Sequence, residues 1–239
     1  MDTVKINKGN VKIIAHRGVS GLECENTCAA FVAAGNRSYF GIETDTHVTS
    51  DGQFAIFHDD NTERVSGVSL EVEASTYAEL SSLRLFDKQE GLTRSDLVIP
   101  KLDEYVRICK RYGKVAVLEL KNAMTKEVCT RIVDIIRELE YLEKTVFISF
   151  SQQNCVYLRE LLPDAKIQFL TTKWEPEVLD FLKEYRLDLD ILHKRVTKEL
   201  VELLHANGHE INVWTVDDAA RAEELADMGV DYITSNILE

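Results

Sequence analysis

The sequence has no long apolar segment. A transmembrane helix needs roughly 20 consecutive apolar residues, and no stretch of this 239-residue chain approaches that length. The amino-terminal segment MDTVKINKGN also lacks the apolar run of a secretory signal. We therefore expect a cytoplasmic protein that does not insert stably into a membrane.

Paired cysteines and basic residues are also scarce. The five cysteines are odd in number and include no Cys-x-x-Cys motif, which argues against a disulfide framework and against a thiolate zinc site. Only 28 Lys and Arg stand against 41 Asp and Glu, so the net charge is −13. A protein that binds nucleic acid needs a basic face, and this charge argues against such a partner. A phosphate-bearing substrate would need a site that reverses the charge locally.

A unit of helix, glycine and strand recurs along the chain. Helical runs stop at Gly35, Gly113, Gly208 and Gly229, and a β-branched segment follows each of them. We expect these four glycines to adopt the left-handed conformation that ends many helices. Before Gly113, apolar residues recur every three or four positions, which predicts a helix with one buried face.

The predicted strands are short apolar runs with little alternation, as expected when both faces of a parallel sheet are buried. There are eight of them: 11–16, 40–45, 114–120, 145–150, 166–170, 188–192, 210–215 and 230–234. This pattern predicts an α/β fold, a TIM-type (β/α)₈ barrel formed as a single domain over residues 1–239. An open doubly wound sheet is the alternative, but the sequence lacks the glycine-rich phosphate turn that such a sheet would have.

One region interrupts the repeat after the second strand. Asp51-Gly52 lies between two strand-like arms and predicts a tight hairpin turn. The polar stretch 61–100 contains no clear barrel element. We expect a hairpin and cap inserted at about 47–100, on the face of the barrel that carries the site, since long connections are usually functional.

Acidic residues occupy the predicted strand ends, where active sites of TIM barrels lie. Glu43 and Asp45 end the second strand and point to the same side, roughly 6.5 Å apart along it. Glu119 ends the third strand and is followed by Lys121. Three converging carboxylates would form a hard, oxygen-rich site suited to one divalent ion, Mg²⁺, Ca²⁺ or Mn²⁺. Alternatively, each acid is an ordinary loop charge paired with Arg17 or Lys121.

Two histidines also fall at neighbouring strand ends. His16 ends the first strand, and His58 ends the hairpin arm that follows the turn. Either one alone would more often be a partly buried histidine bonded to a backbone carbonyl. As a pair beside a metal site, they would suit a general base and a general acid. The other four, at positions 47, 193, 205 and 209, are predicted to be surface or structural residues.

These motifs, in this order, resemble the glycerophosphodiester phosphodiesterase family. The matching segments are HRG, ENT, IETDTHVTSDGQFAIFHD, LELK, VWTV and GVDYITS, which together span nearly the whole chain. The resemblance implies a TIM barrel with an insertion after the second strand. It also implies metal-dependent hydrolysis of small glycerophosphodiesters to an alcohol and glycerol 3-phosphate, with the glycerol 2-hydroxyl as the group that attacks phosphorus.

Residue by residue, the resemblance implies that His16 and His58 are the acid–base pair. It implies that Glu43, Asp45 and Glu119 hold the metal. It places Arg17 and Lys121 on the phosphate, where these cations and the metal would reverse the local field of an acidic protein. Trp214 would line the glycerol or leaving-group side of the pocket, or else would only pack the barrel.

The sequence departs from the family pattern at two places. Cys24-Glu25 precedes the asparagine and threonine of the ENT motif where a proline is usual, and Asn236 stands where an aspartate is common. Both lie outside the set of residues proposed to contact the metal or the substrate, so they are expected to affect loop shape and to leave the chemistry intact. Two other functions remain open from the sequence: a phospholipase D-like enzyme acting on lysophospholipids or sphingolipids, and a non-catalytic barrel binding protein. The first would need an exposed apolar rim, for which Leu83, Leu85, Phe86 and Leu92 are candidates.

Overall fold

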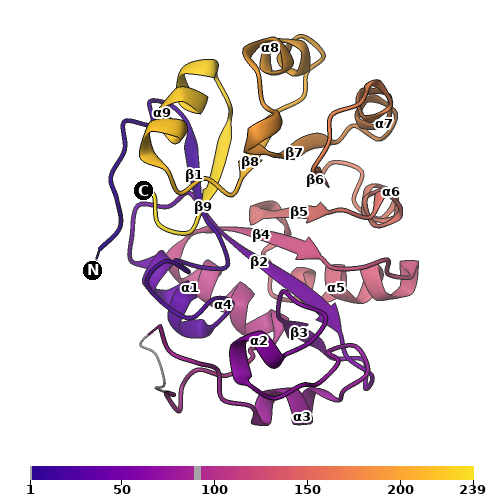
Figure 1. The fold of residues 1–239 in the computed structure, drawn as a ribbon. Helices are drawn as coiled ribbons and strands as arrows, with labels where there is room; N and C mark the ends of the chain where they lie inside the picture. The colour runs from indigo at the N-terminus through magenta and orange to yellow at the C-terminus, as the bar shows by residue number, and fades with distance from the viewer. Residues whose placement is uncertain (1, 89–92) are drawn as a thin grey trace.

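The computed structural model describes residues 2–88 and 93–239. Within these residues, eight parallel strands close into a barrel in the order β1-β9-β8-β7-β6-β5-β4-β2, and β1 pairs back to β2 (Figure 1). The strands are β1 (Lys12–Ala15), β2 (Gly41–Val48), β4 (Val115–Leu120), β5 (Thr145–Ser149), β6 (Lys166–Thr171), β7 (Asp188–Leu192), β8 (Ile211–Trp214) and β9 (Tyr232–Ser235). The predicted TIM barrel is confirmed, and the closure of the sheet excludes the open doubly wound alternative.

Strand β2 is longer than predicted because it continues out of the barrel. Its last residues pair antiparallel with β3 (Phe54–Ile56), with Val48 opposite Phe54. The connection turns at Gly52, whose φ of 74° lies in the left-handed region. The hairpin predicted at Asp51-Gly52 is therefore present.

Helices cover the outside of the barrel (Figure 1). They are α1 (Cys28–Gly35), α4 (Leu102–Tyr112), α5 (Lys126–Glu138), α6 (Gln152–Leu161), α7 (Pro176–Tyr185), α8 (Lys198–Ala206) and α9 (Ala219–Met228), with the short 3₁₀ turns η1 (Leu142–Lys144) and η2 (His193–Arg195). Several begin at a side-chain cap; the Thr27 hydroxyl, for example, accepts the Ala30 N–H at the start of α1. Of the described residues, none belongs to a helix long and apolar enough to cross a bilayer.

Three of the four glycines that were predicted to end helices have the expected left-handed conformation, and one does not. Gly113, Gly208 and Gly229 have φ values of 66°, 80° and 92°, as expected. Gly35 differs, since it is the last residue of α1 and the cap that follows is Asn36 with φ −80°. A Cβ atom on Gly35 would lie 2.5 Å from the ring of Tyr112. The prediction at this position was wrong because glycine is needed there for close helix packing.

The inward-facing side of the barrel divides into an apolar floor and a polar mouth. The floor is a small cluster of inward side chains, made of Ile14, Val117, Val146, Ile148, Leu170 and Tyr232. The larger core lies between the strands and the surrounding helices. Because strand side chains alternate, residues two positions beyond Val117 on β4 and its neighbours again point inward, near the C-terminal strand ends.

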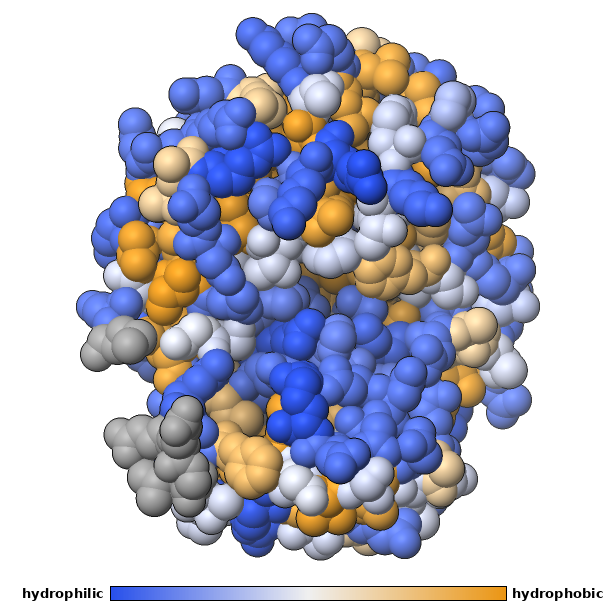
Figure 2. All heavy atoms as spheres, in the orientation of Figure 1, coloured by the Kyte–Doolittle hydropathy of each residue, from blue (hydrophilic) through white to orange (hydrophobic). Residues whose placement is uncertain are grey.

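The segment after the hairpin folds over one side of the barrel and has its own apolar centre. It contains α2 (Glu63–Ser66) and α3 (Tyr77–Ser82), seen together at the lower edge of Figure 1. Its buried apolar residues pack with Cys24 from the loop after β1 and with Ala55 of β3. Together they form a cluster separate from the main core, made of Cys24, Ala55, Phe57, Val65, Val72, Leu80, Leu85, Leu97 and Ile99. Figure 2 shows that hydrophilic residues predominate on this face of the molecule and that apolar residues occur in small groups.

Candidate active site

Three buried carboxylates meet at the C-terminal ends of β2 and β4. Asp45 on β2 is directly opposite Glu119 on β4 in the strand register, and Glu43 precedes Asp45 by two residues on the same face. Glu43, Asp45 and Glu119 are 3%, 1% and 7% exposed. One oxygen atom from each lies within 4.8 Å of the others. The fold therefore brings together the three acids that the sequence predicted to converge.

The charges in this cluster only partly balance. Lys121 places its Nζ 2.9 Å from Glu119 and 3.6 Å from Asp45. Burial opposes ionisation of Asp45, yet Lys121 and Arg17 keep the pKa of this carboxyl below its ordinary value. Burial and the neighbouring Asp45 raise the pKa of Glu43 well above its ordinary value and that of Glu119 to about 7.

The raised pKa values of Glu43 and Glu119 follow from burial beside other carboxylates with too little positive charge to offset it. Three carboxylate groups at this spacing offer only oxygen atoms, which is the donor chemistry of a hard divalent cation. A bound cation would stabilise all three in the ionised form. The cluster thus fits a metal ion.

The loop after β1 places a second set of polar groups beside the three carboxylates. Arg17 has a left-handed backbone with φ 54°, which aims its N–H at Glu43 Oε2, 2.8 Å away. Its guanidinium group pairs with Glu25 at 2.8 Å and lies 3.7 Å from Asp45. The Nε atom of Arg17 is buried and donates to no atom of the described residues. An anion entering the pocket could use this N–H group.

His16 is held by an amide group at the opposite end of the chain. Its Nδ1 lies 2.7 Å from Asn236 Oδ1, and the Asn236 amide nitrogen donates to Asp217 at 2.6 Å, which fixes the amide oxygen toward the histidine. Nδ1 of His16 must therefore carry the proton, leaving the lone pair on Nε2. That atom lies 4.0 Å from Glu43 Oε2. Burial and the Arg17 guanidinium lower the pKa of His16 to about 4, so the ring is neutral at pH 7.

His58 is held by a carboxylate. Its Nδ1 lies 2.6 Å from Asp59 Oδ1, and the other Asp59 oxygen accepts from Arg64 Nε at 2.6 Å. Burial opposes ionisation of Asp59, but hydrogen bonds from Arg64 and His58 lower its pKa to about 2. Burial, together with the nearby cations, lowers the pKa of His58 despite the attraction of Asp45. Arg64 belongs to α2, so the inserted segment helps to orient His58.

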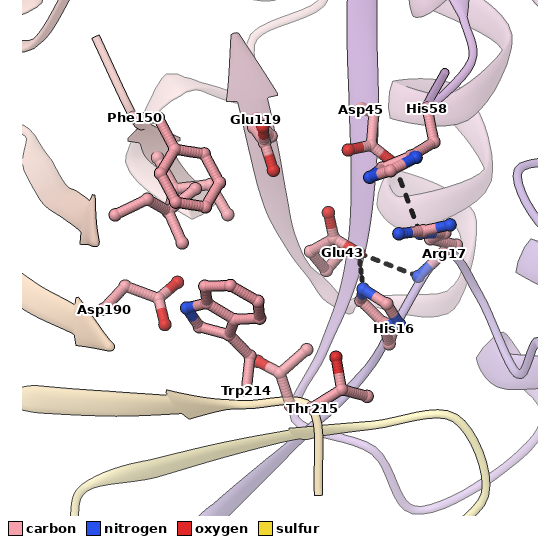
Figure 3. Close-up of a pocket in the computed structure, with 13 residues that line it drawn as sticks. His16, Arg17, Glu43, Asp45, His58, Glu119, Phe150, Asp190, Trp214 and Thr215 are labelled. Carbon is pink, nitrogen blue, oxygen red and sulfur yellow. Dashed lines mark hydrogen bonds and ion pairs between the residues drawn. The ribbon is translucent and has the colours of Figure 1, made fainter. Parts of the chain in front are cut away.

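The histidines, Arg17 and the three acids line one pocket. Its opposite wall is formed by Phe150, Trp214 and Asp190, which face the charged cluster in Figure 3. Phe150 and Trp214 pack edge to face with ring centroids 5.6 Å apart. The pocket therefore has one strongly polar side and one largely aromatic side.

The comparison with known families agrees with this arrangement. The sequence model of the glycerophosphoryl diester phosphodiesterase family matches residues 16–238. The chain belongs to this family. A glycerophosphodiester phosphodiesterase of Bacillus altitudinis is 28% identical over an alignment of 232 positions, and the match covers 93% of this chain and 93% of that one.

Solved structures of similar proteins have the same fold. A glycerophosphodiester phosphodiesterase from Parabacteroides distasonis is 28% identical with a TM-score of 0.80, covering 95% of this chain and 93% of that one. A phosphodiesterase from Oleispira antarctica, solved in complex with the product sn-glycerol-3-phosphate, has a TM-score of 0.86 at 24% identity and covers 98% of this chain and 96% of that one. At 24% identity, the similarity to the Oleispira antarctica structure shows a shared fold and nothing more.

Both departures from the family pattern lie closer to the site than the sequence predicted. Asn236 contacts His16, and Glu25 contacts the Arg17 guanidinium. The expectation that they affect only loop shape was wrong, because the loops after β1 and β9 lie side by side at the barrel mouth. Within the ENT motif, Asn26 also donates to Asp45 Oδ2 at 2.8 Å. That motif was the signal by which the sequence could have revealed this contact.

The structure decides one open alternative and corrects one expectation. His47, expected to be a surface or a structural residue, is structural: it is fully buried, its Nδ1 lies 3.0 Å from Glu73 Oε1 and its Nε2 3.3 Å from the His58 carbonyl oxygen. Leu85 does not form an apolar rim, since it is 1% exposed in the core of the insertion. Phe86 is exposed, and Leu92 lies outside the described residues. Sequence reasoning also missed Asp190 and Phe150 as pocket residues, because nothing in the local pattern distinguishes them from barrel packing.

Proposed function

We propose that this protein hydrolyses glycerophosphodiesters to an alcohol and glycerol 3-phosphate with the help of one divalent metal ion. The observation that carries the proposal is the meeting of three buried carboxylates and two oriented histidines in one pocket of a chain that belongs to the family. Membership of the glycerophosphoryl diester phosphodiesterase family supports the choice of substrate class.

Glu43, Asp45 and Glu119 would hold the metal. When bound, a divalent ion would polarise the phosphoryl oxygens and lower the pKa of a nearby hydroxyl group. Lys121 already contacts two of the three acids. The same ammonium group and the unpartnered Nε of Arg17 would neutralise negative charge that builds on the phosphorus oxygens during the reaction.

We assign the role of general base to His16 and the role of general acid to His58. His16 has a neutral amide as its Nδ1 partner and a free lone pair on Nε2, which suits it to accept a proton. His58 has the Asp59 carboxylate as its partner. Burial lowers the pKa of this ring, but the bond to an anionic partner opposes that effect and stabilises the protonated form. This assignment follows from the partners of the two rings.

The reaction then proceeds in two balanced steps. The glycerol 2-hydroxyl oxygen attacks phosphorus while His16 takes its proton. The bond from phosphorus to the leaving alcohol breaks, and that oxygen takes a proton from His58. Water opens the resulting cyclic phosphodiester with the two histidines in exchanged roles, so that glycerol 3-phosphate is released and both rings return to their starting states.

The two alternative functions receive less support. A phospholipase D-like enzyme would need an extended apolar surface for an acyl chain. Of the candidate rim residues, Phe86 is exposed but Leu85 is buried. A non-catalytic binding protein would be expected to have lost a group at the site. All eight residues that the family resemblance assigned are present and most line one pocket.

An activity screen tests the proposal. The substrates are glycerophosphocholine, glycerophosphoethanolamine, glycerophosphoglycerol and a lysophospholipid, each assayed with Mg²⁺, Mn²⁺ or Ca²⁺ and with chelator. We expect release of glycerol 3-phosphate from at least one glycerophosphodiester, abolished by chelator. A glycerol analogue without the 2-hydroxyl should be inert. Full activity in chelator would exclude the metal, and turnover of the deoxy analogue would indicate direct attack by water.

A further inference from the structure

One end of the pocket has two buried polar atoms that no described residue satisfies. Asp190, on β7, is 1% exposed, and its Oδ1 accepts no hydrogen bond from the described part of the chain. The indole Nε1 of Trp214, on β8, is likewise buried and donates to no described residue. Both residues line the pocket, and Figure 3 shows the nitrogen-bearing edge of the indole turned toward the Asp190 carboxyl group.

A polar layer inside the barrel fixes the orientation of Asp190. The amide nitrogen of Asn212 donates to Asp190 Oδ2 at 3.2 Å and to Gln168 Oε1 at 3.0 Å. The Asn212 amide oxygen accepts from the Thr234 hydroxyl at 3.2 Å. These contacts hold one carboxyl oxygen in the wall and leave the other, Oδ1, for the pocket. Buried polar groups are normally hydrogen-bonded, so the pair of free atoms indicates a ligand group.

We propose that Asp190 and Trp214 form a subsite for a hydroxyl group of the polyol substrate. The hydroxyl would donate its hydrogen to Asp190 Oδ1 and accept the indole N–H of Trp214. The inference rests on the proposed function, because it names the part of a glycerophosphodiester that this wall selects. The hydroxyl belongs either to the glycerol half that keeps the phosphate or to the leaving alcohol.

The two atoms fit a hydroxyl group better than a cationic head group. An ammonium group can only donate hydrogen bonds, so it would leave the indole N–H unpaired, and a quaternary ammonium group can make neither bond. A hydroxyl group is both donor and acceptor and satisfies both atoms at once.

Asp190→Asn tests the subsite with little change in shape. The Asn212 amide nitrogen needs an acceptor, so the new amide would turn its oxygen to Asn212 and its NH₂ to the pocket. Two donors would then face the ligand hydroxyl, whose hydrogen would have no acceptor. Asp188→Asn is the matched control, since Asp188 lies at the start of the same strand and bonds the Glu210 backbone N–H, away from the pocket.

The experiment compares ligand pairs that differ in hydroxyl groups, using Mn²⁺-loaded protein. In the first pair, glycerol 3-phosphate and propane-1,2-diol 1-phosphate compete for binding. In the second pair, glycerophosphoglycerol and glycerophosphopropanol are compared by kcat/KM. Wild type and the Asp188→Asn control should prefer the hydroxyl-bearing member of one pair by about 10–100-fold, since the analogue without the hydroxyl leaves buried polar atoms unsatisfied. Asp190→Asn should lose that preference.

Each result of this experiment either assigns the subsite or overturns the proposal. Loss of preference in the first pair assigns the subsite to the glycerol half, and loss in the second assigns it to the leaving alcohol. An unchanged preference in both pairs overturns the proposal. If Asp190→Asn has an altered melting temperature or Mn²⁺ affinity, Trp214→Phe replaces it, because it removes only the indole N–H and keeps an aromatic ring. The binding pair does not depend on turnover, so an inactive wild type would contradict the proposed function and still test the subsite.

Discussion

Lowering the pH should weaken metal binding by an amount that follows from Glu119. The pKa of this carboxyl is raised to about 7 by burial and Asp45. The group is then about 10% protonated at pH 8, half protonated at pH 7 and about 90% protonated at pH 6. A metal ion must displace that proton. The apparent dissociation constant should therefore rise about tenfold from pH 8 to pH 6, or about 1.4 kcal/mol. Glu43, whose pKa is also raised, would add to the effect.

Calorimetric titration with Mn²⁺ at pH 6, 7 and 8 measures this effect. Each titration is repeated in two buffers of different ionisation enthalpy, so that the number of released protons is obtained directly. We expect about half a proton or more to be released at pH 7. Glu119→Gln, which has no proton to lose, should bind the ion more weakly but with a flatter pH dependence. A dissociation constant that is unchanged between pH 6 and pH 8, with no proton release, would refute the reasoning.

Three further predictions concern the histidines and their partners. His16→Ala and His58→Ala should each lower kcat by roughly 10²–10⁴, with a smaller change in substrate binding; near-normal kcat in either variant would contradict the acid–base assignment. Asn236→Asp should raise the pKa of His16, since a carboxylate stabilises the protonated ring. The acid limb of the kcat/KM profile should then move to higher pH by about 1–2 units, and an unmoved limb would show that His16 is not the base. Arg64→Ala should lower kcat by about tenfold with little loss of melting temperature, because it frees Asp59 and so loosens the hold on the second histidine. The control is Arg84→Ala, which should leave kcat unchanged. Arg84 is an exposed arginine of the same insertion, and among the described residues its side chain donates to the backbone carbonyls of Ser82 and Leu83. Equal losses in both variants would indicate a general effect on the insertion.

The sequence by itself determined the barrel and the three acids. Short unalternating strands separated by amphipathic helices identify a parallel sheet, because local periodicity reports burial. Glu43 and Asp45 share a face because strand side chains alternate, and strand ends fall on one side of the barrel whatever the details of packing. These inferences depend only on residues that are close together in the sequence, so they can be made without a structure.

Only the tertiary structure decided which partners orient the reacting groups. His16 and Asn236 are 220 positions apart in the chain and are brought together by the pairing of β1 with β9. Gly35 was predicted from its position after a helix, yet the ring of Tyr112, on another helix, is what requires glycine there. Asp190 has the sequence context of an ordinary strand residue. Its role depends on Asn212 of the neighbouring strand, which bonds one carboxyl oxygen of Asp190. The other carboxyl oxygen then faces the pocket. Contacts between distant segments arise from barrel closure and side-chain packing, and no local pattern in the sequence encodes them.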